Sequence, residues 1–171
     1  MPAFKRSSEL LNIGGTIDLV DGTPASVTIN LPLSTLDREV FVVTDVQMDT
    51  ERIFAPVAPG VNLITYSVNK TKETVLSIAD SNCIATGGVN IEHTAGGQMV
   101  YQQFRTPDES STGVPADYLT VVATPNFELA GSYVTTAGGT ANKSVFVRLT
   151  GFRAVASADL YAALVTEELN Q

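Results

Sequence analysis

Valine and threonine dominate this chain, with 20 of each among its 171 residues. Both side chains branch at Cβ, which suits the pleated surface of a β-strand better than a helix. Charged residues make up only 16% of the sequence, whereas an average domain has about 25%. We therefore predict an all-β protein with few charges to spread over its surface.

Short segments that alternate between apolar and polar residues are the predicted strands. Ser26–Leu33 alternates without a break, and Val40–Met48 is apolar on both faces in its first half and on one face in its second. Turn pairs such as Asp21-Gly22, Gly87-Gly88 and Gly96-Gly97 separate the segments. The remaining predicted strands are Gly15–Val20, Asn62–Val68, Thr74–Ala79, Val89–Glu92, Gln98–Phe104, Tyr118–Thr124, Phe127–Val134 and Ser144–Ala156, the last with a bulge or bend at Gly151.

The chain divides into three parts. Residues 1–12 lack periodicity and are predicted to be an N-terminal arm, ordered against a neighbour. Residues 13–156 form the β-sandwich or barrel domain. Residues 157–171 form a helix capped by Ser157, with Asp159 in its first turn and one apolar stripe made of Leu160, Tyr161, Leu164 and Val165, which Leu169 extends. Glu167 and Glu168 lie at the unfavourable end of the helix dipole, so we expect the last turn to be frayed or held by a partner.

Residues for catalysis are scarce. Cys83 and His93 are the single cysteine and the single histidine of the chain. We predict a buried thiol at a strand end for Cys83, because no basic neighbour is present to lower its pKa. His93 is predicted to lie on a solvated loop, and zinc binding within one subunit is excluded because zinc needs several His or Cys ligands. No catalytic, cofactor-binding or metal-binding residue is therefore predicted.

Calcium is an alternative to zinc, because calcium needs only oxygen ligands. Asp45, Asp49 and Glu51 are close in sequence, as are Asp108, Glu109 and Asp117, but neither group has the spacing of a known calcium loop. We interpret both groups as solvated acids and the second as the first place to look for an ion. Sugar binding is limited by the absence of Trp, although four tyrosines could stack on sugar rings, namely Tyr66, Tyr101, Tyr118 and Tyr133.

The net charge of −8 argues against nucleic acid as a partner, because an acidic protein repels phosphate backbones. The first residues lack the apolar core of a signal peptide, and no segment has the apolar length of a membrane span. We therefore expect the protein to be made in the cytoplasm and either to stay there or to be released by a route other than a cleaved signal.

A β-rich surface with few charges is poorly protected against association between copies. Symmetric assembly would cover such a surface, and the arm and the helix could hold neighbouring subunits. Arg148 and Arg153 could form salt bridges with a partner or lie on an exposed edge. The alternative is a monomer whose helix packs over the open end of its own sheets.

These features together resemble the single jelly-roll coat proteins of icosahedral viruses. The resemblance is carried by the arm MPAFKRSSELL, by strands such as SVTINLPL, EVFVVTDVQM and SVFVRLTGF, by long polar loops and by the extension SADLYAALVTEEL. It implies an antiparallel β-sandwich of jelly-roll type with about eight strands and one short C-terminal helix. Since the arm is not strongly basic, the chain is more similar to coats of DNA phages or archaeal viruses than to coats that package RNA.

The function expected on this basis is that of a virion structural protein without enzymatic activity, a capsid or decoration subunit of a DNA phage or archaeal virus. Its partners would be copies of itself and other shell proteins, and its location the virion. The alternative function is a carbohydrate- or surface-binding β-sandwich module. A jelly-roll enzyme of cupin type and a fibre or pilus-like subunit are more distant alternatives.

Overall fold

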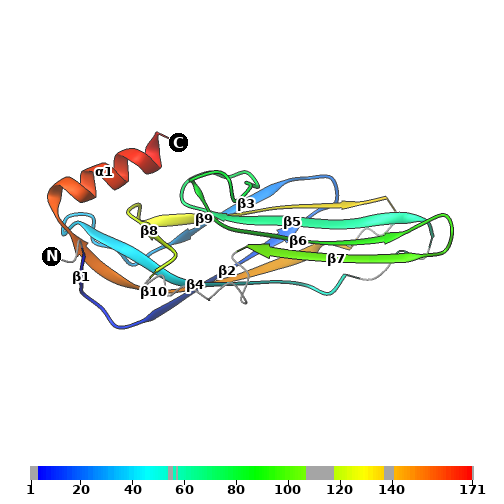
Figure 1. Cartoon of the computed structure of the whole chain (residues 1–171), viewed down its shortest axis with the longest axis horizontal. Helices are drawn as coiled ribbons and strands as arrows, with labels where there is room; N and C mark the ends of the chain where they lie inside the picture. The colour runs from blue at the N-terminus through cyan, green and yellow to red at the C-terminus, as the bar shows by residue number, and fades with distance from the viewer. Residues whose placement is uncertain (1–3, 54–55, 57, 107–117, 137–140, 171) are drawn as a thin grey trace.

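The computed structural model describes residues 4–53, 56, 58–106, 118–136 and 141–170. These residues form two antiparallel sheets and one C-terminal helix (Figure 1). The mostly β composition predicted from the sequence is thereby confirmed. The elements are β1 (Phe4–Arg6), β2 (Leu11–Leu19), β3 (Ala25–Asn30), β4 (Glu39–Thr50), β5 (Gly60–Asn69), β6 (Cys83–His93), β7 (Met99–Thr106), β8 (Thr120–Val122), β9 (Asn126–Thr135), β10 (Lys143–Ala156) and α1 (Ala158–Leu169).

Each sheet has five strands. Sheet I runs β1-β10-β4-β8, with β2 also paired to β10, and sheet II runs β3-β9-β5-β6-β7. Four antiparallel pairs are nested inside one another along the chain: β5 with β6, β4 with β8, β3 with β9, and β2 with β10. The outermost of these pairs, β2 with β10, therefore joins two strands that are far apart in the sequence.

The main core lies between the two sheets. Its fully buried members come from both sheets and include Leu19, Phe41 and Leu149 of sheet I and Ile64 and Phe127 of sheet II. Alternation along each strand places these side chains on the inner face and leaves the polar residues outside.

Strand β4 is covered on both faces in its first half only. The side chains of Phe41 and Val43 enter the main core, while Val40 and Val42 enter a second apolar cluster on the outer face of sheet I. Helix α1 covers that second cluster. In the second half of β4 the exposed or half-buried polar residues alternate with Val46 and Met48, as the sequence pattern predicts.

Helix α1 begins as the sequence predicts. The Ser157 side chain accepts a hydrogen bond from the Leu160 backbone N–H at 3.3 Å, and Asp159 lies in the first turn. The predicted stripe packs against the second cluster through Leu160, Tyr161, Leu164 and Val165. Leu169 does not extend the stripe, because its side chain is 68% exposed.

The pairing of β10 with β4 is irregular at Gly151, where the sequence predicts a bulge or bend. The register between β10 and β4 shifts between Thr150 and Gly151. A Cβ atom on Gly151 would lie 2.3 Å from the carbonyl oxygen of Val42, so only glycine fits this close approach of the two backbones.

Two local predictions are wrong. Thr74–Ala79 is part of the loop between β5 and β6, since its backbone is held by side chains instead of a neighbouring strand. Gly87 and Gly88 lie inside β6 and do not form a turn, because the Tyr66 ring occupies the space beside Gly87 and the Phe104 ring that beside Gly88. Gly97, by contrast, does lie in a turn, with a φ of 78°.

The N-terminal segment packs on its own chain. Phe4–Arg6 pairs with Ala154–Ala156 of β10, and β2 begins at Leu11, inside the predicted arm. The Glu39 carboxylate accepts hydrogen bonds from the Ser7 hydroxyl at 3.0 Å and the Ser34 backbone N–H at 2.9 Å.

Candidate functional site

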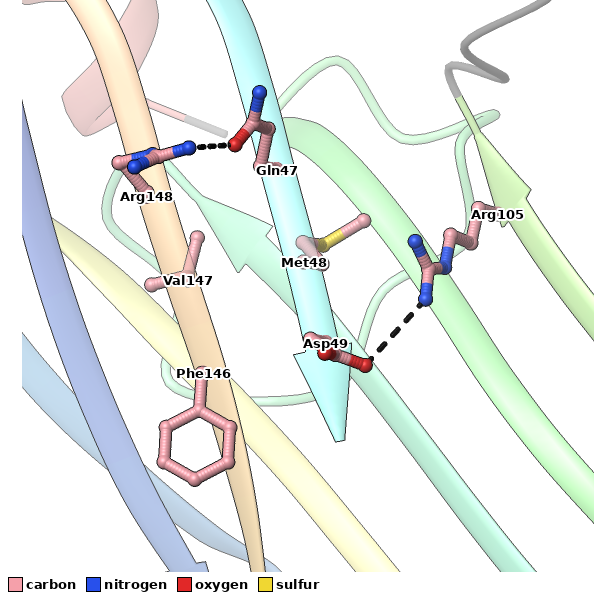
Figure 2. Close-up of a pocket in the computed structure, with 7 residues that line it drawn as sticks. All are labelled: Gln47, Met48, Asp49, Arg105, Phe146, Val147 and Arg148. Atoms are coloured by element: carbon pink, nitrogen blue, oxygen red, sulfur yellow. Dashed lines mark hydrogen bonds and ion pairs between the residues drawn. The ribbon is translucent and has the colours of Figure 1, made fainter. Parts of the chain in front are cut away.

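A groove lies between the sheets where the second half of β4 faces β7. Asp49 of β4 and Arg105 of β7 form an ion pair of 3.6 Å across it, which Figure 2 shows bridging two strands from different sheets. Asp49 and Arg105 line two adjoining hollows of about 420 and 390 Å³. The Asp49 side chain is 77% exposed, so this pair is screened by water and contributes little to stability.

Polar side chains continue from this ion pair along the inner face of β7. The Gln103 amide, with its oxygen turned toward Arg105, accepts from Nε at 3.2 Å and from Nη2 at 2.9 Å, and its nitrogen donates to the Tyr101 hydroxyl at 3.0 Å. Tyr66 lies beneath Gly87 in the same region. Burial raises the pKa of Tyr66 and the positive charge of Arg105 partly opposes that shift, so the phenol stays protonated at neutral pH.

The hollow of about 420 Å³ continues from the Asp49–Arg105 pair onto the outer face of sheet I. Arg148 of β10 donates a hydrogen bond to the side chain of Gln47 on β4, and Phe146 lies next to it along β10 with 43% of its side chain exposed (Figure 2). Arg148 thus has an intrachain partner. Arg153 likewise forms an intrachain ion pair, with Glu39 at 3.4 Å.

Neither the single cysteine, Cys83, nor the single histidine, His93, lies in the groove. Cys83 begins β6 with its thiol half-buried, and burial raises its pKa to about 11. His93 ends β6 and does not lie on a loop as predicted; its Nδ1 lies 3.1 Å from the carbonyl oxygen of Pro56. A thiol with so high a pKa is a weak nucleophile at neutral pH.

The first calcium candidate is spread along a strand. Asp45 and Asp49 point to the same face of β4 but are four residues apart, which separates them by about 13 Å. Glu51 accepts a hydrogen bond from the Ser144 backbone N–H at 3.3 Å. Within the described residues no group of three acids, histidines or cysteines is positioned to hold a metal ion. The second candidate, Asp108, Glu109 and Asp117, lies outside the described residues.

The four tyrosines proposed for sugar stacking do not gather at one place. Tyr66 and Tyr133 are in the main core. Tyr118 packs edge-on against Phe4 with ring centroids 6.1 Å apart, next to sheet I. Tyr101 alone among the four lies on β7, beside the groove.

The C-terminal helix is held by its own chain. Glu168 is 1% exposed, and its carboxylate accepts hydrogen bonds from the backbone N–H groups of Ala123 and Thr124, both at 2.9 Å. The last turn is therefore ordered by residues that follow β8. The sequence did not reveal this role, because a Glu near a helix C-terminus ordinarily faces solvent.

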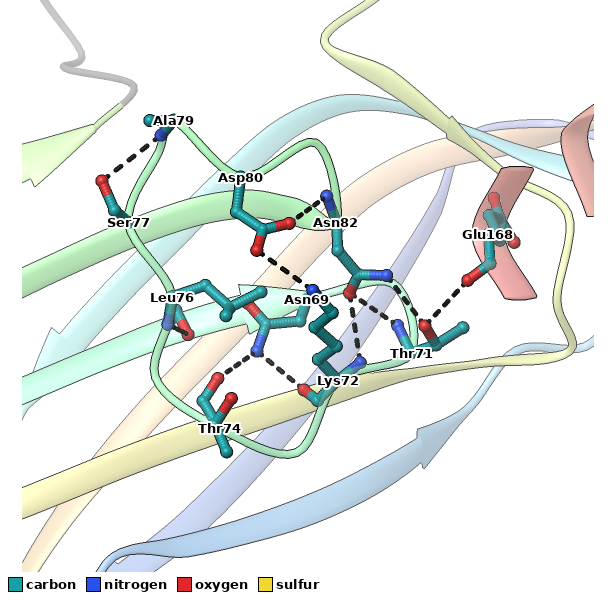
Figure 3. A network of polar contacts seen from close by, with 11 residues as sticks. Asn69, Thr71, Lys72, Thr74, Leu76, Ser77, Ala79, Asp80, Asn82 and Glu168 are labelled. Carbon is teal, nitrogen blue, oxygen red and sulfur yellow. Dashed lines mark hydrogen bonds and ion pairs between the residues drawn. The ribbon is translucent and has the colours of Figure 1, made fainter. Parts of the chain in front are cut away.

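A polar network joins this helix to the loop between β5 and β6 (Figure 3). The Thr71 hydroxyl donates to the Glu168 carbonyl at 3.1 Å, and Asn82 accepts from the backbone N–H groups of Thr71 and Lys72. Lys72 also pairs with Asp80 at 3.2 Å. The backbone N–H of Asn82 and the Lys72 ammonium hold the pKa of Asp80 below its usual value.

Strand β7 is the main surface feature that the sequence analysis missed. Four of the 13 large hydrophobic side chains that are exposed in the described residues lie on this one strand: Met99 at 50%, Val100 at 36%, Tyr101 at 61% and Phe104 at 49%. The strand is at the edge of sheet II and pairs, among described strands, only with β6. A signal was present in the sequence, since Gln98–Phe104 holds no charged residue and no proline.

The chain matches no protein-family model, no curated protein and no solved structure. Among the described residues, no helix combines the length and the apolar character that crossing a bilayer requires.

Proposed function

We propose that the chain is a structural protein without enzymatic activity, a capsid or decoration subunit of a virion that assembles with copies of itself. The observation that carries this proposal is the exposed apolar edge of β7. Natural proteins usually protect a sheet edge with charges, proline or a bulge. An edge without such protection is suited to a position inside an assembly, where a neighbour covers it.

The strand order supports a β-sandwich of jelly-roll type. With β1 and β7 set aside, eight strands remain, and the nested pairs run from β5–β6 at the tip to β2–β10 at the ends. This is the pairing of one long hairpin folded over lengthwise into two sheets. A two-sheet jelly roll has this eight-stranded form, and viral coat proteins use it.

The surroundings of Cys83 and His93 favour a structural role over catalysis. The thiol has a raised pKa, and the imidazole Nδ1 lies against the Pro56 carbonyl oxygen. The two chain ends pack on their own subunit through β1 and Glu168. The assembly contact proposed here therefore does not depend on exchanging the arm or the helix between subunits.

The groove beside Asp49 and Arg105 favours a second candidate function, a carbohydrate-binding module. It offers a carboxylate, a guanidinium and the Gln103 amide for sugar hydroxyl groups, next to the half-exposed ring of Tyr101. In this function the protein stays monomeric, and a glycan raises its melting temperature. A Tyr101→Ala variant would lose that rise.

Molar mass in solution separates the two functions. Light scattering coupled to size-exclusion chromatography, followed by electron microscopy, should show symmetric species of several subunits as the protein concentration rises. Phe104→Lys places a charge on the β7 edge and should shift the wild-type distribution toward the monomer, whereas the matched variant Thr28→Lys on the opposite edge strand β3 should not. A wild-type protein that stays monomeric at high micromolar concentration would refute assembly.

A further inference from the structure

Among the residues that the structure describes, strand β7 has one paired edge, with β6, and one open edge. Its register with β6 runs without a shift from Thr86↔Thr106 to His93↔Met99, so no bulge turns the open edge away from a partner. Its single charged residue, Arg105, is already bound to Asp49 across the groove. The other edge strand of sheet II, β3, is a contrast, because no member of it is an exposed large hydrophobic residue.

We infer that the open edge of β7 pairs with β7 of a second copy of this chain, antiparallel and around a two-fold axis, and so joins two copies of sheet II into one continuous sheet. This inference rests on the proposed function, for which it names one contact surface. A two-fold contact is self-complementary, so the same strand must supply both sides.

The two faces of β7 determine the register. The Phe104 ring lies over Gly88, and Val100 and Gln102 share this outer face by alternation. Tyr101 lines the groove on the inner face together with Gln103. In a continuous antiparallel sheet, two residues directly opposite each other point to the same face. Because neighbouring residues of β7 point to opposite faces, the two-fold axis must pass midway between the two copies of one and the same residue.

An axis at Gln102 places Phe104 of each copy opposite Val100 of the other. The apolar pair then occurs twice, once on each side of the axis, with the two Gln102 side chains between them. An axis at Gln103 would instead place Phe104 opposite Gln102 and leave Val100 opposite Thr106. Cross-strand pairs of an aromatic and a β-branched residue stabilise a sheet, which favours the axis at Gln102.

Charge is compatible with this arrangement. The chain has a net charge of −8, but its sequence holds no acid between Glu92 and Asp108, so β7 brings no negative charge to the contact. In the Gln102 register the two Arg105 residues are six strand positions apart, about 20 Å. This exceeds the Debye length of about 8 Å at physiological salt, so their repulsion is largely screened.

The contact is small, which sets its strength. Tyr101 and Phe104 are each about half exposed, and together they offer about 200 Å² for burial, given about 150–250 Å² for a whole aromatic side chain. A typical stable interface buries about 800 Å² per partner. The β7 pair alone is thus a weak contact that persists when a shell repeats it many times.

Disulfide trapping tests the contact and its register. In a Cys83→Ser background, Gln102→Cys places a thiol at the axis, opposite its own copy. Gln103→Cys is the matched control, because Gln103 is also exposed but its Cα faces Tyr101 of the other copy. Disulfides need Cα atoms within about 7 Å, so Gln102→Cys should form covalent dimers at least about tenfold faster than Gln103→Cys under mild oxidation. Adding Phe104→Lys should abolish the difference, and circular dichroism should show that all variants stay folded.

Each outcome has a separate meaning. Equal rates for the two cysteine variants, or a faster Gln103→Cys, would overturn the register. Absence of covalent dimers at concentrations where the wild-type protein forms oligomers would overturn the β7 contact and leave the proposed function standing. A wild-type protein that never oligomerises would overturn both.

Discussion

Glu168 provides a direct test of how the C-terminal helix is held. Its buried carboxylate accepts hydrogen bonds from the backbone N–H groups of Ala123 and Thr124, and none of the salt bridges among the described residues includes it. The substitution Glu168→Gln keeps the shape of the side chain and removes one of its two accepting oxygens. The remaining oxygen still lies within reach of both backbone N–H groups, at 3.2 Å from Ala123 and 2.9 Å from Thr124, but the new NH₂ group faces the Ala123 N–H and is a buried donor without a partner.

The expected cost follows from these contacts. A hydrogen bond to a charged group contributes about 1.5–3 kcal/mol, and an unsatisfied buried donor costs about 1–3 kcal/mol. We expect Glu168→Gln to weaken the docking of α1 by about 2 kcal/mol and Glu168→Ala, which leaves both donors unsatisfied, by about 4 kcal/mol. A loss of 2 kcal/mol corresponds to about a 30-fold change in an equilibrium constant.

Hydrogen exchange is the appropriate assay, because a terminal helix can open without unfolding the sheets. In Glu168→Gln the amides of Ala158–Leu169 should exchange about 30-fold faster, along with those of Ala123 and Thr124. The control is Leu169→Ala, the adjacent exposed position, which should change exchange little. If Glu168→Gln leaves the exchange of α1 within a factor of about two of wild type, the anchoring role assigned to this carboxylate is wrong.

Three further perturbations test other parts of the structure. Gly151→Ala should lower the free energy of unfolding in urea by about 2–3 kcal/mol, because its Cβ would overlap the Val42 carbonyl; Gly14→Ala, where the nearest atom would be 3.4 Å away, should cost less. The Cys83 thiol has a pKa raised to about 11 by burial, so its alkylation rate in the native protein should keep rising tenfold per pH unit from about pH 8 to 10, where an exposed thiol levels off. Burial also raises the pKa of Glu128, so its contribution to stability is present below the unfolded pKa of about 4.3 and is lost as pH rises through the folded value. Glu128→Gln should therefore gain stability relative to wild type as the pH of a denaturation series is raised from 4 to 7, and an unchanged difference would contradict the burial of this carboxyl.

Patterns that depend on local periodicity predicted the structure well. The two-sided burial of Val40–Val43, the cap at Ser157 and the irregular pairing at Gly151 each follow from a residue and its immediate neighbours. Alternation and capping are local signals, so the sequence contains them in full.

Features that depend on distant partners could not be predicted in this way. The pair Gly87-Gly88 resembles a turn in the sequence, because the Tyr66 and Phe104 rings that require glycine at these positions come from other strands. Glu168 resembles a solvated acid in the sequence, because its hydrogen-bond partners belong to the backbone that follows β8. The Asp49–Arg105 pair joins strands of different sheets, and no spacing in the sequence indicates it.

Strand β10 pairs with β1, β2 and β4, yet it follows every other described strand in the chain. Sheet I consequently lacks this strand until β10 has left the ribosome, and until then β1 and β2 have no strand of sheet I to pair with. Pairings so distant in sequence form slowly, and partly folded chains with open edges are prone to aggregate. Production of this protein should therefore depend on temperature and chaperone supply during synthesis far more than the stability of the finished fold would indicate.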